Sequence, residues 1–340
     1  MTYRKVYRLM PKAGSINNLR LVDEAVVPPV KNEVVVSVKA IGLNFADIFA
    51  MFGLYSATPK GSFIPGLEFS GEIIECGVEV VDFKAGDKVM GVTRFGGYAN
   101  HVTINAKYLT KLPIDWGFEE GAAYLVQALT AYYALVNLGN VRKGDTVLIH
   151  SAAGGVGLLA NRIALAMGAT TIGTVGSQSK IPLLKEQGYS TGIVRSKNFK
   201  HDLENALDGK KLSVVLECVG GRYFTDSYKA MEKQGRIVVY GSARYATHGS
   251  RPNYLKLIWK YLTRAKLDPQ KMIEENKSVL GFNLIWLYER AELMEEVLKG
   301  LSQLDIGKPY VGHIYEFDQM LNAIRMFQSG KTVGKVVVRT

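Results

Sequence analysis

A turn of small residues near the middle of the chain has the composition and spacing of a phosphate-binding site. An apolar run of strand length, 146–150, precedes it, and a helical pattern, 158–167, follows it. Glycines let the backbone approach a pyrophosphate closely and let the helix pack against the strand. The free N–H groups and the positive dipole end of that helix would face the phosphates. The residues that we expect to contact a pyrophosphate are Ala153, Gly154, Gly155, Val156 and Gly157.

The spacing of this turn differs from the common dinucleotide fingerprint, G-x-G-x-x-G. Ala152 stands where the first glycine would be, so the segment reads A-x-G-G-x-G. Alanine is small enough for that position, and the placement between a strand and a helix supports a dinucleotide site. A tight turn without a ligand is the alternative.

The segment after the next strand bears on the type of dinucleotide. Enzymes that use NAD tend to place Asp or Glu about 20 residues beyond the glycine turn, where it bonds the ribose hydroxyl. Segment 174–180 contains no acid. The sequence therefore predicts NADPH, with contacts from Thr174 and Ser177 and with Lys180 and Arg195 near the 2′-phosphate. For Lys180 the alternative is an exposed lysine in the first turn of a helix.

Length and composition indicate an ordinary globular protein of two domains, because the chain has 340 residues and is 47% hydrophobic. No apolar run reaches the roughly 18 residues that a membrane span requires. Cys76 and Cys218 are too few for a four-ligand zinc site and suggest no disulfide framework. We therefore expect a cytoplasmic protein.

The formal charge is +11, a balance that attracts nucleic acids or anionic membranes when it is concentrated on one face. Most basic residues are dispersed, so no specific nucleic-acid partner is predicted. The densest stretch is a basic amphipathic helix expected over 254–266. A cover over the cleft or a solvated face is the favoured interpretation of this helix, and weak contact with a membrane surface is the alternative.

The order of elements predicts an α/β protein with two different domains. Residues 1–123 are rich in short apolar runs and turns, which indicates a partly open β-barrel. A helix is expected over 118–138, after which strands and helices alternate, and this alternation calls for a doubly wound parallel sheet. A long helix is expected over 282–302. The final strand pattern, 335–339, has no partner left in that sheet and is expected to return to the barrel. We therefore assign 1–123 and 268–340 to the barrel domain and 124–267 to the nucleotide-binding domain.

Several sequence phrases along the whole chain carry a resemblance to a known family. They are GLNFAD (42–47), GLY (53–55), PGLEFSG (65–71), AGDKVM (85–90), LTAY (129–132), HSAAGGVG (150–157), VLGFNL (279–284) and VGKV (333–336). The chain resembles the medium-chain dehydrogenase/reductase superfamily, and most closely its zinc-free quinone oxidoreductases of the zeta-crystallin type. Within these it looks most like the subgroup of the synaptic vesicle membrane protein homologues. The resemblance implies a GroES-like barrel domain and a Rossmann domain.

Departures from the family pattern indicate a metal-free site. Zinc alcohol dehydrogenases of this superfamily carry a catalytic Cys where this chain has Asn44, and a His where it has Leu67. The cysteine-rich structural zinc lobe is also missing, so no metal ligands are assigned. Relatives often carry Arg at the position of Met51 and Gln at that of Asn161, and the first change puts the usual substrate range in question.

The resemblance also implies further site residues. Asn44 would hydrogen-bond near the nicotinamide ribose or the acceptor oxygen, and Tyr55 would close the cleft or donate a proton. The alternatives are a buried, turn-forming Asn44 and a rim Tyr55 without a proton role. Beyond these two, the cofactor contacts that we expect are Thr130, Gly241, Ser242, Phe282, Asn283 and Lys335. Simple helix packing is the alternative for Thr130, and none of the histidines is assigned to catalysis; His150 is expected to be structural.

A metal-free site of this kind suits hydride transfer from NADPH to an acceptor that is already electron-poor, such as a quinone or an α,β-unsaturated carbonyl. One alternative is an enoyl-thioester reductase of the polyketide type. Another is a cofactor-binding protein with a role at a membrane or on RNA. A homodimer is the family expectation, and the exposed edge of the nucleotide-binding sheet gives it a physical reason.

Overall fold

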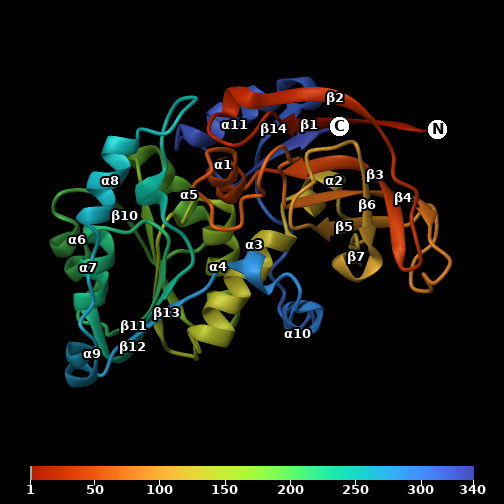
Figure 1. Ribbon diagram of the computed structural model, residues 1–340. Coiled ribbons are helices and arrows are strands. Elements are labelled where there is room, and N and C mark those ends of the chain that lie inside the picture. The colour runs from red at the N-terminus through yellow and green to blue at the C-terminus, as the bar shows by residue number, and fades with distance from the viewer. Residues whose placement is uncertain (1) are drawn as a thin grey trace.

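The computed structural model describes residues 2–340 and contains two large β-sheets that lie side by side (Figure 1). Residue 1 of the predicted segment 1–123 lies outside the described residues. A separate antiparallel hairpin, β1 (Tyr3–Leu9) and β2 (Leu19–Ala25), lies along the first sheet. The two-domain α/β architecture predicted from the order of elements is confirmed.

The first sheet forms the barrel domain and has the order β14-β15-β3-β4-β5-β7, with β6 also paired to β3. Its strands are β3 (Glu33–Gly42), β4 (Glu68–Cys76), β5 (Lys88–Val92), β6 (His101–Asn105), β7 (Leu109–Lys111), β14 (Val311–Glu316) and β15 (Lys335–Arg339). The alternating pattern of β3 sends Val34, Val36 and Val38 into the barrel core. The short helix α1 (Phe45–Met51) follows β3 directly and carries polar residues of the site.

The second sheet is parallel and has the order β10-β9-β8-β11-β12-β13. Its strands are β8 (Thr146–Ile149), β9 (Thr170–Val175), β10 (Thr191–Val194), β11 (Leu212–Glu217), β12 (Met231–Val239) and β13 (Ser278–Gly281). The chain winds outward from β8 in one direction and then from β11 in the other. This reversal is the switch point at which doubly wound sheets bind ligands, beyond the carboxyl ends of the strands.

Helices cover both faces of the second sheet, because neighbouring strand residues alternate between two cores. Val147 and Ile149 enter the core beneath α3 (Leu125–Tyr132), α4 (Gly155–Ala166) and α5 (Ile181–Glu186). Leu148 enters the core beneath α6 (Phe199–Leu207) and α7 (Arg222–Ala230). This burial on both faces explains why the strands read as continuous apolar runs in the sequence.

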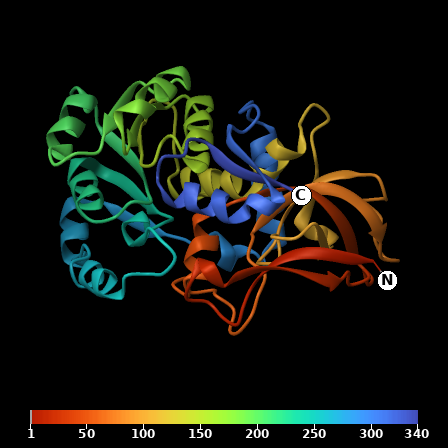
Figure 2. The same ribbon diagram turned by 90° about the horizontal axis from the view of Figure 1, so that it is seen from above.

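The end of the chain returns to the barrel, as predicted. Strand β15 pairs antiparallel with β3, with Val338 opposite Ile41. Just before it, the Gly334 N–H donates to the Ala153 carbonyl oxygen at 2.7 Å, so the returning segment passes beside the glycine turn. Seen from above, helix α11 (Met320–Gln328) lies between the two sheets (Figure 2).

Three expectations need correction. Strand β13 pairs with β12, with Arg236 opposite Ser278, so this strand of the predicted segment 268–340 belongs to the nucleotide-binding sheet. The helix expected over 282–302 starts only at α10 (Ala291–Ser302), because Leu284–Leu287 form a 3-10 turn at the cleft. The helix expected over 118–138 is divided into α2 (Phe118–Ala122), α3 and a π-helical turn (Tyr133–Leu138). The other predicted boundaries of the two domains remain predictions.

The basic helix is shorter than the predicted 254–266. It is α8 (Tyr254–Leu262), and α9 (Pro269–Glu275) follows it. Thr263 caps the end of α8, and its hydroxyl donates to the Trp259 carbonyl oxygen at 2.8 Å. Within residues 2–340, no helix combines the length and the apolar character needed to cross a bilayer.

Candidate active site

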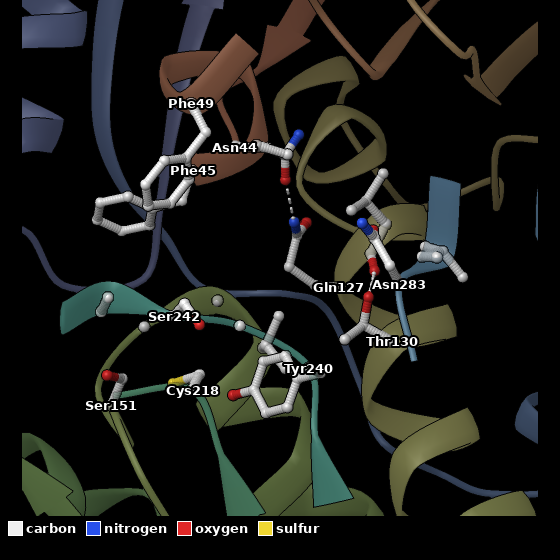
Figure 3. Close-up of a pocket in the computed structure, with 18 of the residues that line it drawn as sticks. Asn44, Phe45, Phe49, Gln127, Thr130, Ser151, Cys218, Tyr240, Ser242 and Asn283 are labelled. Carbon is white, nitrogen blue, oxygen red and sulfur yellow. Dashed lines mark hydrogen bonds between the residues drawn. The ribbon is translucent and has the colours of Figure 1, made fainter. Parts of the chain in front are cut away.

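A cavity of about 1020 Å³ lies between the two domains and takes its lining from both of them (Figure 3). It contains the glycine turn, the start of α1, one side of α3 and the carboxyl ends of β9, β11 and β12. The sequence-predicted residues that line it are Asn44, Tyr55, Thr130, Ala153, Gly154, Gly155, Val156, Gly157, Lys180, Arg195, Gly241, Ser242, Phe282, Asn283 and Lys335. Residues from both ends of the sequence are thereby brought to one cleft.

The glycine turn has the close packing that its sequence predicts. Gly154 caps α4 and Gly155 is its first residue. A Cβ added at Gly157 would lie 2.6 Å from the Ser151 carbonyl oxygen and 2.7 Å from Ala152 backbone atoms, so only glycine fits there. Open N–H groups at this helix start and a glycine-lined approach suit a pyrophosphate. On this observation the residues present fit a dinucleotide.

The segment after β9 supplies two cations to the same end of the cavity. Arg195 donates to the Thr174 carbonyl oxygen at 3.4 Å and to its hydroxyl at 3.3 Å, and the structure shows no carboxylate partner for it among residues 2–340. Lys180 donates to the carbonyl oxygens of Gly330 (2.8 Å) and Thr332 (2.7 Å). Burial, and then the nearby Arg195, lower the pKa of Lys180. Both side chains therefore concentrate positive charge beside the cavity.

Thr174 and Ser177 are the two predicted contacts that do not line the cavity. The Thr174 hydroxyl lies 2.9 Å from Nδ1 of the buried His150, and Ser177 faces Ser179 at 2.9 Å. His150 is structural, as expected, because its Nε2 also bonds Ser227. Thr174 instead accepts hydrogen bonds from Arg195, which lines the cavity.

A buried polar network forms the floor of the cavity around Asn44. The Asn44 amide donates to Glu68 Oε1 at 2.9 Å and to the Gly42 carbonyl oxygen at 3.2 Å. Its Oδ1 accepts from Gln127 Nε2 at 2.8 Å (Figure 3). The same oxygen also accepts from Lys335 Nζ at 2.9 Å. These four bonds use the full hydrogen-bonding capacity of an asparagine side chain.

Two charged residues of this network are buried together. Lys335 Nζ forms a short ion pair with Glu68 Oε1, and both side chains are at most 4% exposed. Burial lowers the pKa of Lys335, and Glu68 partly offsets that effect. Glu68 Oε2 also accepts from the Val126 N–H at 3.1 Å, which ties the barrel to α3.

Asp47 lies beneath the network and is fully buried. Its Oδ2 accepts from the Asn44 N–H at 2.8 Å and from the Tyr98 hydroxyl at 3.1 Å, so it caps the start of α1. Burial raises the pKa of Asp47 to about 7, although these hydrogen bonds and Lys335 oppose the rise.

Sequence reasoning did not identify Glu68 or Gln127 as site residues. Gln127 Oε1 is buried without a hydrogen-bond partner among the described residues, and Gln127 lines the cavity. The third N–H of Lys335 also has no assigned acceptor in residues 2–340. Glu68 lies within an apolar strand pattern, and a carboxylate buried there requires a partner. This pattern was the signal by which the sequence could have identified Glu68.

The far wall of the cavity is aromatic, and one hydrogen bond connects the two domains across it. The Tyr55 hydroxyl donates to Asn283 Oδ1 at 2.7 Å, which joins the barrel domain to the segment after β13. Phe282 packs edge-on against Tyr133 with 5.0 Å between ring centroids. Thr130 donates to the Val126 carbonyl oxygen at 2.6 Å. Within residues 2–340, no group of three or more His, Cys, Asp or Glu side chains is arranged to hold a metal.

Comparisons with known proteins agree with this geometry. Residues 30–114 match the model of the alcohol dehydrogenase GroES-like domain, and residues 155–299 match that of the zinc-binding dehydrogenases. The synaptic vesicle membrane protein VAT-1 homolog of Rattus norvegicus is 32% identical over 330 residues, covering 96% of this chain and 81% of the relative.

Solved structures extend the likeness to enzymes. The quinone oxidoreductase of Thermus thermophilus, solved also in complex with NADPH, superposes with a TM-score of 0.82 at 30% identity, covering 99% of this chain and 100% of that one. The CurK enoyl reductase reaches a TM-score of 0.85 at 27% identity, covering 99% of each chain. The predicted pairing of a GroES-like domain with a Rossmann domain is therefore confirmed. This chain belongs to the medium-chain dehydrogenase/reductase superfamily, among its quinone oxidoreductase-like members.

Proposed function

We propose that this protein is an NADPH-dependent, zinc-independent reductase that transfers hydride to a quinone or an α,β-unsaturated carbonyl compound. The observation that carries the proposal is a single cavity with a glycine-lined helix start, two cations beside it and an apolar, aromatic far end. The Thermus thermophilus relative, which is described as a quinone oxidoreductase in complex with NADPH, supports it.

The cofactor would lie along the cavity with its pyrophosphate at the start of α4 and its 2′-phosphate near Arg195 and Lys180. Bound NADPH would supply the hydride to an electron-poor acceptor. Lys335, Gln127 and Asn44 lie at the cavity floor, near the middle of the cleft. The unpartnered Gln127 oxygen accepts a hydrogen bond and Lys335 donates one, so the pair suits a hydroxyl or a carboxamide.

Asn44 acts mainly as a positioning residue in this proposal. Its four hydrogen bonds to protein are complete, so contact with the nicotinamide ribose or the acceptor oxygen requires it to release one of them. Lys335 keeps an N–H to donate without such an exchange. The predicted direct role of Asn44 stays a prediction.

Tyr55 serves to close the cleft rather than to donate a proton. Burial raises the pKa of Tyr55 to about 12, although its hydrogen bond to Asn283 opposes the rise. A hydroxyl with such a pKa holds its proton at neutral pH. The Tyr55–Asn283 bond instead excludes water from the acceptor end, which the apolar side chains of Phe45, Phe49 and Ile285 also line.

The side chains at the zinc positions of the family do not suit zinc. Asn44 and Leu67 are poor or non-ligands for an ion that prefers thiolate, imidazole and carboxylate. Polarisation of the acceptor therefore falls to hydrogen bonds from the cavity floor. Such bonds are sufficient for acceptors that are already activated, and this favours quinones and enones over simple ketones.

A panel of acceptors tests the proposal. Purified protein should oxidise NADPH with ortho- or para-quinones or with small enones, and simple ketones should give no rate above background. An enoyl thioester forms the second arm, because likeness to the CurK enoyl reductase favours that class as the second candidate. Turnover of the thioester alone would replace the first assignment by the second, and the absence of NADPH oxidation in every arm would contradict both.

Cofactor choice gives a more specific prediction. Replacing Arg195 with Gln should raise the KM for NADPH by about tenfold or more and leave the KM for NADH nearly unchanged, because a charge-assisted bond to phosphate is worth roughly 1.5–3 kcal/mol. Arg222→Gln is the matched control, since Arg222 pairs with Asp226 and does not line the cavity. Equal changes for both cofactors would contradict the placement of the 2′-phosphate at Arg195.

We also propose a homodimer formed through the edge of the nucleotide-binding sheet. Strand β13 is the last strand of that sheet and has one strand neighbour among the described residues. Its unpaired N–H and C=O groups form a template for a symmetric partner strand.

A further inference from the structure

Helix α8 carries an apolar face that the cavity does not use. Its inner residues, Tyr254, Leu257, Ile258 and Tyr261, line the cleft. Leu255, Trp259 and Leu262 point elsewhere and are 83%, 62% and 66% exposed. Their spacing of four and three residues places them on one side of the helix. Figure 1 shows α8 at the outer edge of the nucleotide-binding domain, and none of its residues is buried.

The same stretch carries positive charge without any acid. Segment 251–267 contains no Asp or Glu. Its cations are Arg251, Lys256, Lys260, Arg264 and Lys266. Lys256 and Lys260 are four residues apart on α8, so they lie on one side of the helix beside the apolar face, and Arg264 follows just beyond the end of the helix. Lys256 and Arg264 are exposed, and Lys260 donates to the Arg244 carbonyl oxygen.

We propose that this outer face of α8, formed by Leu255, Trp259 and Leu262 with the adjoining cations, docks on an anionic lipid bilayer. A helix with bulky apolar residues on one side and lysines on another lies in the interface plane of a membrane. Tryptophan favours the headgroup level, and each nearby Lys or Arg is attracted to an anionic surface. The inference stands apart from the proposed reductase activity.

The details of the surface favour lipid over other occupants. A nucleic acid would engage the cations and stack on Trp259, but it offers no apolar volume for Leu255 and Leu262. A second copy of the chain would bring like charges together, since the cations beside this face would lie near those of the other copy. An acyl-chain boundary takes the leucines while the headgroups meet the cations.

Co-sedimentation of the full chain with vesicles tests the proposal. The protein should bind vesicles of phosphatidylcholine mixed with phosphatidylserine, bind phosphatidylcholine alone much more weakly, and lose binding at high salt. The triple variant Leu255→Ser, Trp259→Ser and Leu262→Ser should lower the partition coefficient by at least about tenfold. NADPH turnover in solution, measured in parallel, separates failure of this inference from failure of the proposed function.

A matched control uses apolar residues that are equally exposed but lie in the barrel domain. Val78, Val81 and Ile114 are 94%, 87% and 105% exposed, and their joint replacement with Ser should leave vesicle binding unchanged. In a Trp116→Phe and Trp286→Phe background, the emission of Trp259 should shift to the blue when anionic vesicles are added. Thermal unfolding of each variant confirms that the fold is retained.

Three outcomes would overturn the proposal. They are no binding of the native chain to anionic vesicles, vesicle binding that survives the α8 triple variant, and an equal loss of binding in the Val78, Val81 and Ile114 control. Binding of the native chain to a single-stranded RNA homopolymer without binding to vesicles would instead assign the surface to nucleic acid.

Discussion

Replacing Lys335 with Met should lower the free energy of unfolding by about 3–5 kcal/mol, because it leaves the Glu68 carboxylate buried without its cation. The pair lies beneath the cavity, and both side chains are almost fully enclosed. The remaining donors to Glu68 are amides from Asn44, Gln127 and Val126, which bear no positive charge to compensate the carboxylate. Urea unfolding of the native and variant chains at one pH measures the difference.

A surface ion pair on the same strand provides the control. Arg339 bonds Glu119 and lies near Glu316, but its side chain is 48% exposed. Arg339→Met should therefore cost less than about 1 kcal/mol. Adding Glu68→Gln to the Lys335 variant should recover much of the lost stability, because the buried charge is then removed. Similar losses in free energy of unfolding for the Lys335 and Arg339 variants would show that the buried ion pair stabilises the fold no more than the surface pair.

Loss of Lys335 should also lower the rate of turnover in the cleft. Asn44 Oδ1 would keep Gln127 as its donor and lose Lys335, so its side chain would be less firmly oriented. Holding groups in place contributes to rate through orientation, so turnover should fall further than cofactor affinity. The buried pair thus links the stability of the barrel to the geometry of the site.

Local patterns in the sequence predicted the parts of the fold that depend on short-range spacing. The strand over 335–339 and the glycine turn both follow from period and residue size, and the structure places both where the patterns indicate. The return of the tail to the barrel followed from topology, because the parallel sheet was already complete without it. The zinc-free character was inferred from the family positions of Asn44 and Leu67.

Other features depend on contacts between distant segments and left little local signal. Glu68 and Lys335 are 267 residues apart, so spacing gave no indication that they pair. The prediction of a helix from residue 282 was wrong, because Leu284–Leu287 form a 3-10 turn whose apolar residues enter the cleft. Helical period alone does not distinguish such a turn from the start of an α-helix. In the sequence, Gln127 looks like any other residue of a helix. Only its unpartnered oxygen in the structure identifies it as a residue of the site.

Stability of this protein should depend on pH through Asp47. Burial raises the pKa of Asp47 to about 7, whereas the carboxyl of an unfolded chain has a value near 3.8. A carboxyl with a raised pKa in the folded state favours folding most when it is protonated. Its contribution is complete below about pH 4 and is lost as the pH rises towards 7, where the folded protein must hold a buried carboxylate.

Asp47→Asn isolates this effect, because the amide oxygen still accepts from the Asn44 N–H and the Tyr98 hydroxyl but cannot ionise. The free energy of unfolding of the variant should exceed that of the native chain by an amount that grows by roughly 2–3 kcal/mol as the pH rises from 5 to 8. Urea unfolding of both chains across that range measures the gain. Parallel curves would mean that Asp47 ionises in the folded protein as easily as in the unfolded chain, because Lys335 and the hydrogen bonds then balance the effect of burial.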